Sequence, residues 1–216
     1  MIDFAKLEEE QRKLAKKVII SDYFDKLELI GGVHAAYQQD DIVSAIVVCD
    51  YKTMDVKERV FAIAKARIPY VPGFLAFREG PSISEAYAKL EIKPDILIFG
   101  GNGILHPRRC GLASHMGVLL DQSAIGVAKQ LFIGDEKGSV IYVGKEARAG
   151  LVLTREYSKA VYVSPGHKIS LKSSIEIVKN CTRFPHKLPE PLHLAHKLAK
   201  EIMERTLKGE IKLNIN

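Results

Sequence analysis

Residue types that could do chemistry are concentrated between Asp95 and His115, in the segment DILIFGGNGILHPRRCGLASH. The segment begins with the apolar run 96–99, which is typical of a buried strand, and continues into the glycine-rich turn 100–103. Imidazole and guanidinium side chains follow this turn, beginning at His106. Because ligands bind beyond the carboxyl ends of strands in open α/β sheets, this pattern predicts a binding site at the end of the strand.

Three further side chains lie at or near the ends of expected strands. Lys129 follows the short apolar run 124–128 and could neutralise a phosphate as a point charge. His167 follows a strand and a Pro-Gly turn, where an imidazole could act as a ligand or a general base. His34 lies inside the expected strand 29–37, and a histidine in that position is more often a partly buried structural side chain than a ligand.

A rigid loop and a carboxylate complete the set. Pro69 and Pro72 are three residues apart, which excludes both a helix and a central strand, and they hold Tyr70 between them. A rigid exposed aromatic side chain suits stacking on bases or insertion between them, and the alternative is a tyrosine packed on the body of the domain. Glu79 lies where the helix 78–90 is expected to begin, so a simple interaction with the helix dipole is its alternative role.

The elements that must position these side chains form a strand meander followed by alternating strands and helices. This order predicts one α/β domain, residues 1–216, with a mixed central sheet. Helices are expected at 2–17, 78–90, 111–121, 169–181 and 191–207, and strands at 29–37, 42–51, 54–66, 95–99 and 124–128, with two or three more within 138–163.

Composition restricts the partners and the compartment. The chain has 216 residues, of which 47% are hydrophobic and 27% are charged, and its net charge of +6 favours polyanionic partners, with nucleic acid first. Its three cysteines are far apart and lack metal-binding spacing, which favours the reducing cytoplasm. The charged, helix-periodic segment 2–17 does not resemble a signal peptide, and no apolar run approaches the roughly 18 residues of a membrane span.

The ordered segments GGVHAAY, PYVPGFLAFREGP, KPDILIFGGNGILHPRRCGLASHMGV, IGVAK and VSPGH closely resemble endonuclease V, the enzyme of deaminated-base repair, over roughly residues 4–205. The resemblance implies a ribonuclease-H-like α/β fold, with a mixed central sheet flanked by helices. It also implies a phosphodiester hydrolase that depends on Mg²⁺ or Mn²⁺ and acts on inosine-containing DNA or RNA. Family members cut the second phosphodiester 3′ to the lesion and leave 3′-hydroxyl and 5′-phosphate ends.

The resemblance also implies roles for individual residues. Glu79 matches a metal-ligating carboxylate, Lys129 matches the lysine near the scissile phosphate, and His167 matches the active-site histidine. The wedge that separates strands near the lesion is matched by a loop that we call the wedge loop, which consists of Pro69, Tyr70, Val71, Pro72 and Gly73. The segments that enclose the flipped base are matched by Gly101, Asn102, Gly103, Leu105 and Gly111, with His106 and Arg108 as phosphate-binding or supporting groups or as structural hydrogen-bonding partners of the glycine loop.

Two positions depart from the family pattern. The family has Gly-Val-Asp at the first strand and Phe-Asp-Gly after the central strand, whereas this chain has His34 and Gly100 at the two aspartate positions. Mg²⁺ prefers anionic oxygen ligands, and imidazole suits manganese better. The metal ligands that remain are Glu79, His34 and His167, so manganese is the more plausible ion. Asp95 cannot replace the carboxylate missing at residue 100, because five residues of strand span about 16 Å.

Three functions are compatible with this pattern. The first is an active endonuclease V-like enzyme that uses Glu79, Lys129, His167 and His34. The second is a catalytically inactive homologue that still binds nucleic acid. The third, an oligomeric scaffold with no nucleic-acid role, is disfavoured by the retained Tyr70 and by the basic charge. A monomer is favoured over an oligomer, and a cytoplasmic location is expected.

Overall fold

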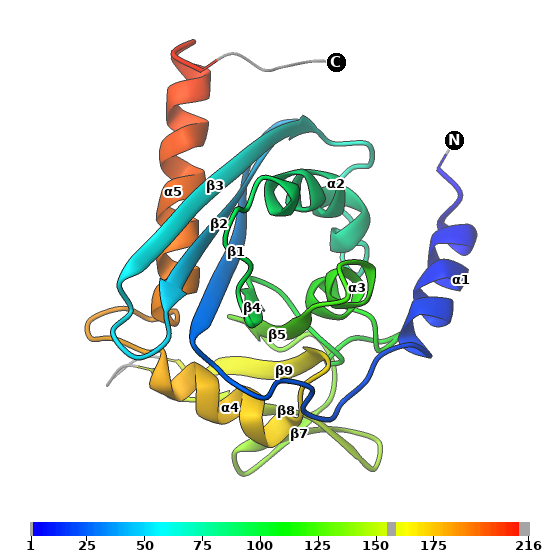
Figure 1. Cartoon of the computed structure of the whole chain (residues 1–216). Coiled ribbons are helices and arrows are strands. Elements are labelled where there is room, and N and C mark those ends of the chain that lie inside the picture. Colours follow the sequence, from blue (N-terminus) through cyan, green and yellow to red (C-terminus); the bar gives the residue numbers. More distant parts are fainter. Residues whose placement is uncertain (1, 155–158, 212–216) are drawn as a thin grey trace.

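A mixed sheet of nine strands forms the centre of the computed structural model, which describes residues 2–154 and 159–211 (Figure 1). Its strands are β1 (Leu29–Gln38), β2 (Asp41–Asp50), β3 (Val56–Lys65), β4 (Ile96–Phe99), β5 (Ser123–Ala128), β6 (Asp135–Lys137), β7 (Val140–Val143), β8 (Glu146–Val152) and β9 (Val161–His167). They lie in the order β3-β2-β1-β4-β5-β9-β8-β7-β6. The strands β1, β4 and β5 are parallel to one another, and the remaining pairs are antiparallel.

Helices cover both faces of the sheet (Figure 1). They are α1 (Phe4–Ala15), α2 (Leu75–Ala88), α3 (Leu112–Leu119), α4 (Leu171–Asn180) and α5 (Glu190–Leu207). One face carries α4 and α5, and the other carries α2 and α3. The helix α1 lies outside these layers and packs against α3.

The central strands are buried on both faces, so their sequences are continuously apolar instead of alternating. Successive side chains of β1 therefore enter different cores. Ile30 packs with Leu192 in the core under α5, whereas Val33 packs with Ile83 in the core under α2. By the same alternation His34 faces α5.

A glycine permits the close approach of α5 to the sheet. A Cβ atom added at Gly32 would lie 2.1 Å from the carbonyl carbon and oxygen of Pro191, the second residue of α5. Such a distance is far inside van der Waals contact, so a side chain at this position would separate the helix from β1. Gly32 therefore fixes the position of α5 relative to β1.

The structure confirms the expected elements and changes some boundaries. The helix expected to begin at Arg78 begins one turn earlier, at Leu75, so Glu79 lies inside α2 and not at its start. The segment 138–163 contains two whole strands and the beginning of β9, and the short strand β6 precedes it. The three cysteines are buried and unpaired. Within residues 2–154 and 159–211, no helix is both long and apolar enough to cross a membrane.

Candidate nucleic-acid site

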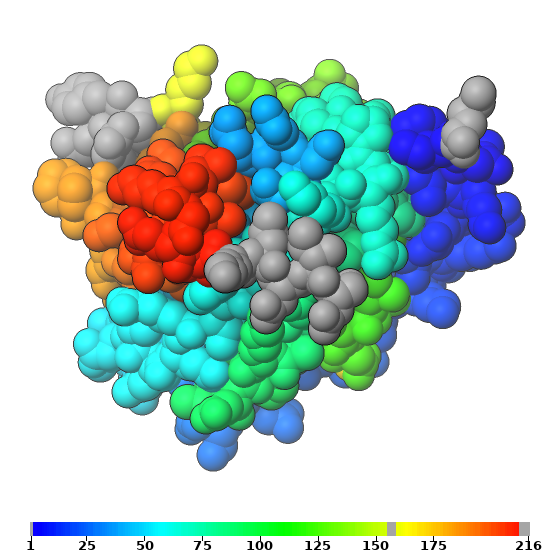
Figure 2. Space-filling model, turned by 90° about the horizontal axis from the view of Figure 1, so that it is seen from above, coloured from blue at the N-terminus to red at the C-terminus, as the bar shows by residue number. Residues whose placement is uncertain are grey.

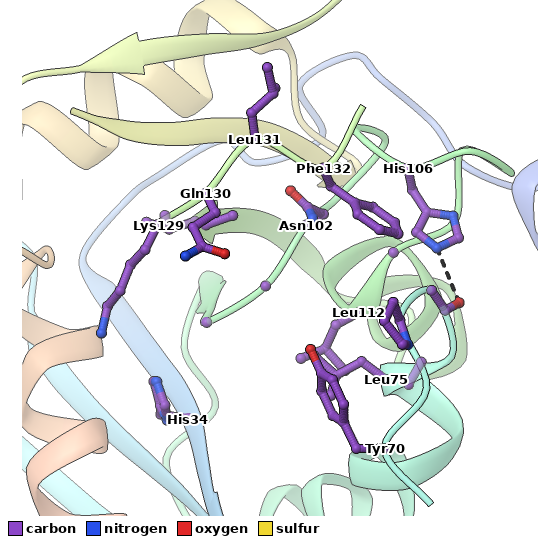
Figure 3. A pocket seen from close by; sticks show the side chains of 18 of the residues that line it. His34, Tyr70, Leu75, Asn102, His106, Leu112, Lys129, Gln130, Leu131 and Phe132 are labelled. Carbon is purple, nitrogen blue, oxygen red and sulfur yellow. Dashed lines mark hydrogen bonds between the residues drawn. The ribbon is translucent and has the colours of Figure 1, made fainter. Parts of the chain in front are cut away.

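A cavity of about 570 Å³ opens at the carboxyl ends of β1, β4 and β5 (Figure 3). Its walls are formed by the last residues of these strands, the glycine turn after β4, the segment 127–132, the wedge loop and the start of α5. This is the end of the sheet at which the sequence predicted a site. Because the three strands are parallel, the loops that follow them meet at one place.

Imidazoles and a lysine lie on one side of the cavity. The side chain of Lys129 extends toward His34 (Figure 3). The ring of His34 packs edge to face on the ring of His196 from α5, with ring centroids 4.5 Å apart. Burial and the neighbouring His196 lower the pKa of His34 to about 4, so His34 is neutral at physiological pH. Its Nδ1 donates to the carbonyl oxygen of Ala35 at 2.8 Å, which leaves a lone pair on Nε2.

The ring of His34 fills the space beside Gly100. A Cβ atom added at Gly100 would lie 2.8 Å from Cδ2 and 3.2 Å from Nε2 of His34. No side chain at residue 100 can coexist with this ring position. The two departures from the family pattern are therefore in direct contact, and one neutral ring lies where the resemblance implies two carboxylates.

Glu79 lies in α2, on the other side of the sheet from α5. Its side chain is only 4% exposed, and burial raises its pKa to about 8, an effect that Arg78 partly offsets. Arg78 donates to the carbonyl oxygens of Ile68 at 2.6 Å and Gln39 at 2.9 Å. The pKa of the Tyr37 phenol is raised first by burial and second by the neighbouring carboxyl group of Glu79. The raised pKa keeps Glu79 mostly protonated at neutral pH, although Arg78 is adjacent.

These residues do not fit a magnesium ion. Across the described part of the chain, no group of three or more histidine, cysteine, aspartate or glutamate side chains could hold a metal. Magnesium requires anionic oxygen ligands, whereas this site offers neutral imidazoles beside the positive charge of Lys129. Asp95 does not compensate, because its Oδ2 accepts the backbone N–H groups of Glu28 at 2.8 Å and Leu29 at 2.9 Å.

His167 is not brought together with the other predicted site residues. His167 is the last residue of β9 and is buried against α3. Its Nδ1 accepts the backbone N–H of Ile19 at 3.2 Å, and the side chain does not line the cavity. The imidazole that does contact His34 belongs to His196, which the sequence analysis missed. Among the described residues, Nδ1 of His196 is buried without a hydrogen-bond partner. The sequence signal that could have identified His196 is its position as a polar residue directly after Ala195, which belongs to the buried face of α5.

The opposite side of the cavity carries the aromatic side chains. Tyr70 is 60% exposed and lies across the opening from Lys129 (Figure 3). Phe132 and His106 contact each other farther along this side, near Gly73. Of the residues predicted to recognise the base or separate strands, the cavity is lined by Tyr70, Val71, Pro72, Gly73, Gly101, Asn102, His106 and Gly111, and it is not lined by Pro69, Gly103 or Leu105. Leu105 belongs instead to a small core with Ile141 and Ala149.

Proteins of known sequence resemble this chain over nearly its whole length. The family model described as Endonuclease V matches residues 12–197. The chain is 44% identical over 210 residues to "Endonuclease V" of Dictyoglomus thermophilum, covering 93% of this chain and 91% of that protein. It is 39% identical to "Endonuclease V" of Geotalea uraniireducens, covering 98% of this chain and 94% of that protein.

Solved structures agree with the fold. An endonuclease V of Bacillus subtilis superposes with a TM-score of 0.88 at 30% identity, covering 97% of this chain and 95% of the other. A Ciona intestinalis endonuclease V, solved with a 24mer DNA containing an inosine followed by a ribo-adenosine, gives a TM-score of 0.85 at 30% identity. That match covers 94% of this chain and 98% of the other. The expected ribonuclease-H-like α/β fold is thereby confirmed.

Proposed function

Because the chain belongs to the endonuclease V family, we propose that it binds inosine-containing DNA or RNA in the cavity between Tyr70 and Lys129. We further propose that it supports little or no magnesium-dependent cleavage. The family consists of metal-dependent nucleases. The observation that carries the second part is the contact between His34 and Gly100, which replaces both implied aspartates with one neutral ring.

Binding is supported by the shape and the charge of the cavity. An exposed aromatic side chain on one side and a lysine on the other suit a base and a phosphate, respectively. Among the described residues that line the cavity there is no aspartate or glutamate, so the positive charge of Lys129 is not offset there. A deaminated base is also easier to extrude from a duplex than a normal one, because it pairs weakly.

The residues of the cavity can hold a phosphodiester without cutting it. Lys129 neutralises a phosphate oxygen, and the free lone pair of His34 can accept a hydrogen bond from bound water or from the nucleic acid. Cleavage with manganese is the second candidate function, because the imidazoles of His34 and His196 suit manganese better than magnesium.

A single assay separates the two candidates. The protein is incubated with single- and double-stranded inosine DNA and with inosine RNA, in magnesium and separately in manganese, and binding and nicking are scored independently. Binding without nicking in magnesium is the expected result. Nicking in magnesium that disappears in Glu79→Ala would overturn the loss of cleavage, and the absence of any preference for inosine would overturn the binding function. Nicking confined to manganese, and lost in His34→Ala, would establish the second candidate.

A further inference from the structure

The carbonyl oxygen of Gly73, the last residue of the wedge loop, accepts three hydrogen bonds. They come from Nε2 of Gln11 at 2.9 Å, Nη2 of Arg108 at 3.0 Å and Nε2 of His106 at 3.1 Å, the last of which is drawn in Figure 3. Gly73 has a φ of +85°, a conformation that favours glycine. Two segments far apart in sequence, α1 and the loop after β4, thus converge on one backbone atom.

The hydrogen bonds among these donors are mutually consistent. Nδ1 of His106 accepts the backbone N–H of Arg108 at 3.2 Å, so its Nε2 carries the proton that is donated to Gly73. Oε1 of Gln11 accepts Nε of Arg108 at 2.6 Å, and Nε2 of Gln11 also donates to the carbonyl oxygen of Cys110 at 3.1 Å. Gln11 is 1% exposed, so both ends of a buried amide are satisfied.

One face of α1 makes all of these contacts. Phe4, Glu8 and Gln11 are spaced four and three residues apart, which places them on the same side of the helix. Phe4 packs edge to face on Phe74 with centroids 5.1 Å apart, and Glu8 pairs with Arg108 at 3.2 Å. α1 lies at the rim of the molecule, across the visible face from α5 (Figure 2), so its main described contacts are with α3 and this loop region.

The other end of the wedge loop is also anchored. The carbonyl oxygen of Ile68, just before the loop, accepts Nη1 of Arg78 at 2.6 Å. Tyr70 lies in the chain between the hydrogen-bonded carbonyl groups of Ile68 and Gly73, and it is itself 60% exposed. Its position is therefore determined more by the anchors of its backbone than by packing of its ring.

We propose that α1 is part of the nucleic-acid-binding machinery and that Gln11 is a positioning residue, which holds the wedge loop so that Tyr70 is ordered before nucleic acid binds. This inference rests on the proposed binding of inosine-containing nucleic acid. An ordered aromatic side chain lowers the entropy that binding must otherwise overcome. The benefit is greatest for a duplex, in which Tyr70 has to separate two strands.

The absence of tryptophan from the chain allows a direct test. Tyr70→Trp introduces a single indole at the wedge, and Gln11→Met is added to remove the hydrogen bonds while keeping a side chain of similar length. Acrylamide quenching of the indole should rise and its anisotropy should fall. The preference for inosine duplex over inosine single strand should fall by roughly fivefold to thirtyfold, which corresponds to about 1–2 kcal/mol of lost preorganisation.

Two controls isolate the hydrogen bonds from general damage to α1. Leu14→Ala removes a buried apolar contact of the same helix, and Lys13→Ala alters an exposed side chain. Each control should leave quenching near that of Tyr70→Trp alone. Circular dichroism and thermal unfolding verify that each protein is folded, and Gln11→Leu provides a second variant if Gln11→Met does not fold.

The inference is overturned if quenching or the duplex preference is unchanged by the folded Gln11 variant. It is also overturned if Leu14→Ala raises quenching as much as Gln11→Met does. If Tyr70→Trp alone shows no preference for inosine while the native chain also shows none, the proposed function fails. The quenching measurement, made without nucleic acid, then still decides whether Gln11 orders the wedge loop.

Discussion

The imidazole of His34 lies where a side chain at Gly100 would have to be, with Cδ2 of the ring 2.8 Å from an added Cβ atom. The two positions therefore form one steric unit. A change at residue 100 requires a change at residue 34, whereas His34 can be reduced in size without affecting Gly100. This relationship determines the order in which carboxylates can be returned to the site.

Gly100→Asp alone should destabilise the protein by about 1–3 kcal/mol, because the new side chain overlaps the partly buried ring of His34. The same substitution in a His34→Ala background should cost much less. Urea unfolding of the two single variants and the double variant gives the coupling free energy. If the changes in the free energy of unfolding of the two single variants add up to that of the double variant, residues 34 and 100 are not coupled, and the steric relationship is contradicted.

Magnesium should stabilise the His34→Asp plus Gly100→Asp variant but not the native chain. Two returned carboxylates repel each other in the absence of a cation and supply the anionic oxygens that magnesium requires. Thermal unfolding across a magnesium titration measures this as a rise in Tm with concentration. Potassium chloride at matched ionic strength is the control. An equal magnesium-dependent rise in the native chain would mean that the present residues already form a site.

Glu79→Gln should change how stability depends on pH. The folded state raises the pKa of Glu79 from 4.5 to about 8, so the folded protein holds this proton more tightly than the unfolded chain does. Stability is then fully present below about pH 4.5 and is lost as the pH rises toward about 8. Relative to the native chain, Glu79→Gln should gain stability over this range, by at most about 5 kcal/mol.

Chemical denaturation at about pH 5 and about pH 9 measures this difference. Glu85→Gln, on an exposed position of the same helix, is the matched control and should show no such trend. A pH-independent difference between Glu79→Gln and the native chain would contradict the protonated state of Glu79.

Sequence patterns predicted most of this fold because its central strands are continuously apolar and its helices follow a clear period. They also located the cavity, since a strand that ends in glycines predicts a site there. They did not identify the imidazole that contacts His34. His167 and His196 look alike in sequence, and only the packing of α5 against β1 brings His196 to the site.

The role of Gln11 was equally inaccessible from sequence. Its partners Gly73 and Arg108 are 62 and 97 residues away, so no local pattern connects them. Glu79 was expected where a helix begins, whereas it lies one turn inside α2, and the sequence pattern gave no indication of its burial. Burial depends on the sheet that covers the helix, and it changes the charge of this carboxyl group.

His167 and His196 should respond differently to replacement by alanine. His167→Ala removes a buried hydrogen bond to the backbone of Ile19 and should lower stability by about 1–3 kcal/mol, with little effect on oligonucleotide affinity. His196→Ala should weaken oligonucleotide binding more than it lowers stability, because this ring borders the cavity through His34. Thermal unfolding and fluorescence anisotropy on the same samples measure both effects. A loss of affinity confined to His167→Ala would reverse the assignment.

Lys129→Met should reduce the salt dependence of binding as well as the affinity. If Lys129 contacts one phosphate, the slope of log affinity against log salt concentration for duplex should become shallower by about 0.9. Anisotropy titrations at several salt concentrations provide the slope. Lys137→Met, on the short edge strand β6, is a control of equal charge change. An identical slope for Lys129→Met and the native chain would exclude a phosphate contact at this residue.

The distance between the rings of His34 and His196 is set by the packing of the main chain at Gly32. His34 is two residues further along β1 and His196 is five residues beyond Pro191, so the close packing of Pro191 on Gly32, which leaves no room for a Cβ atom, determines how far apart both rings lie. Any residue larger than glycine would push α5 away from β1 and would expose the packed surfaces between them to water. The dielectric environment of the cavity, and with it the strength of every charge inside, thus depends on a residue that has no side chain.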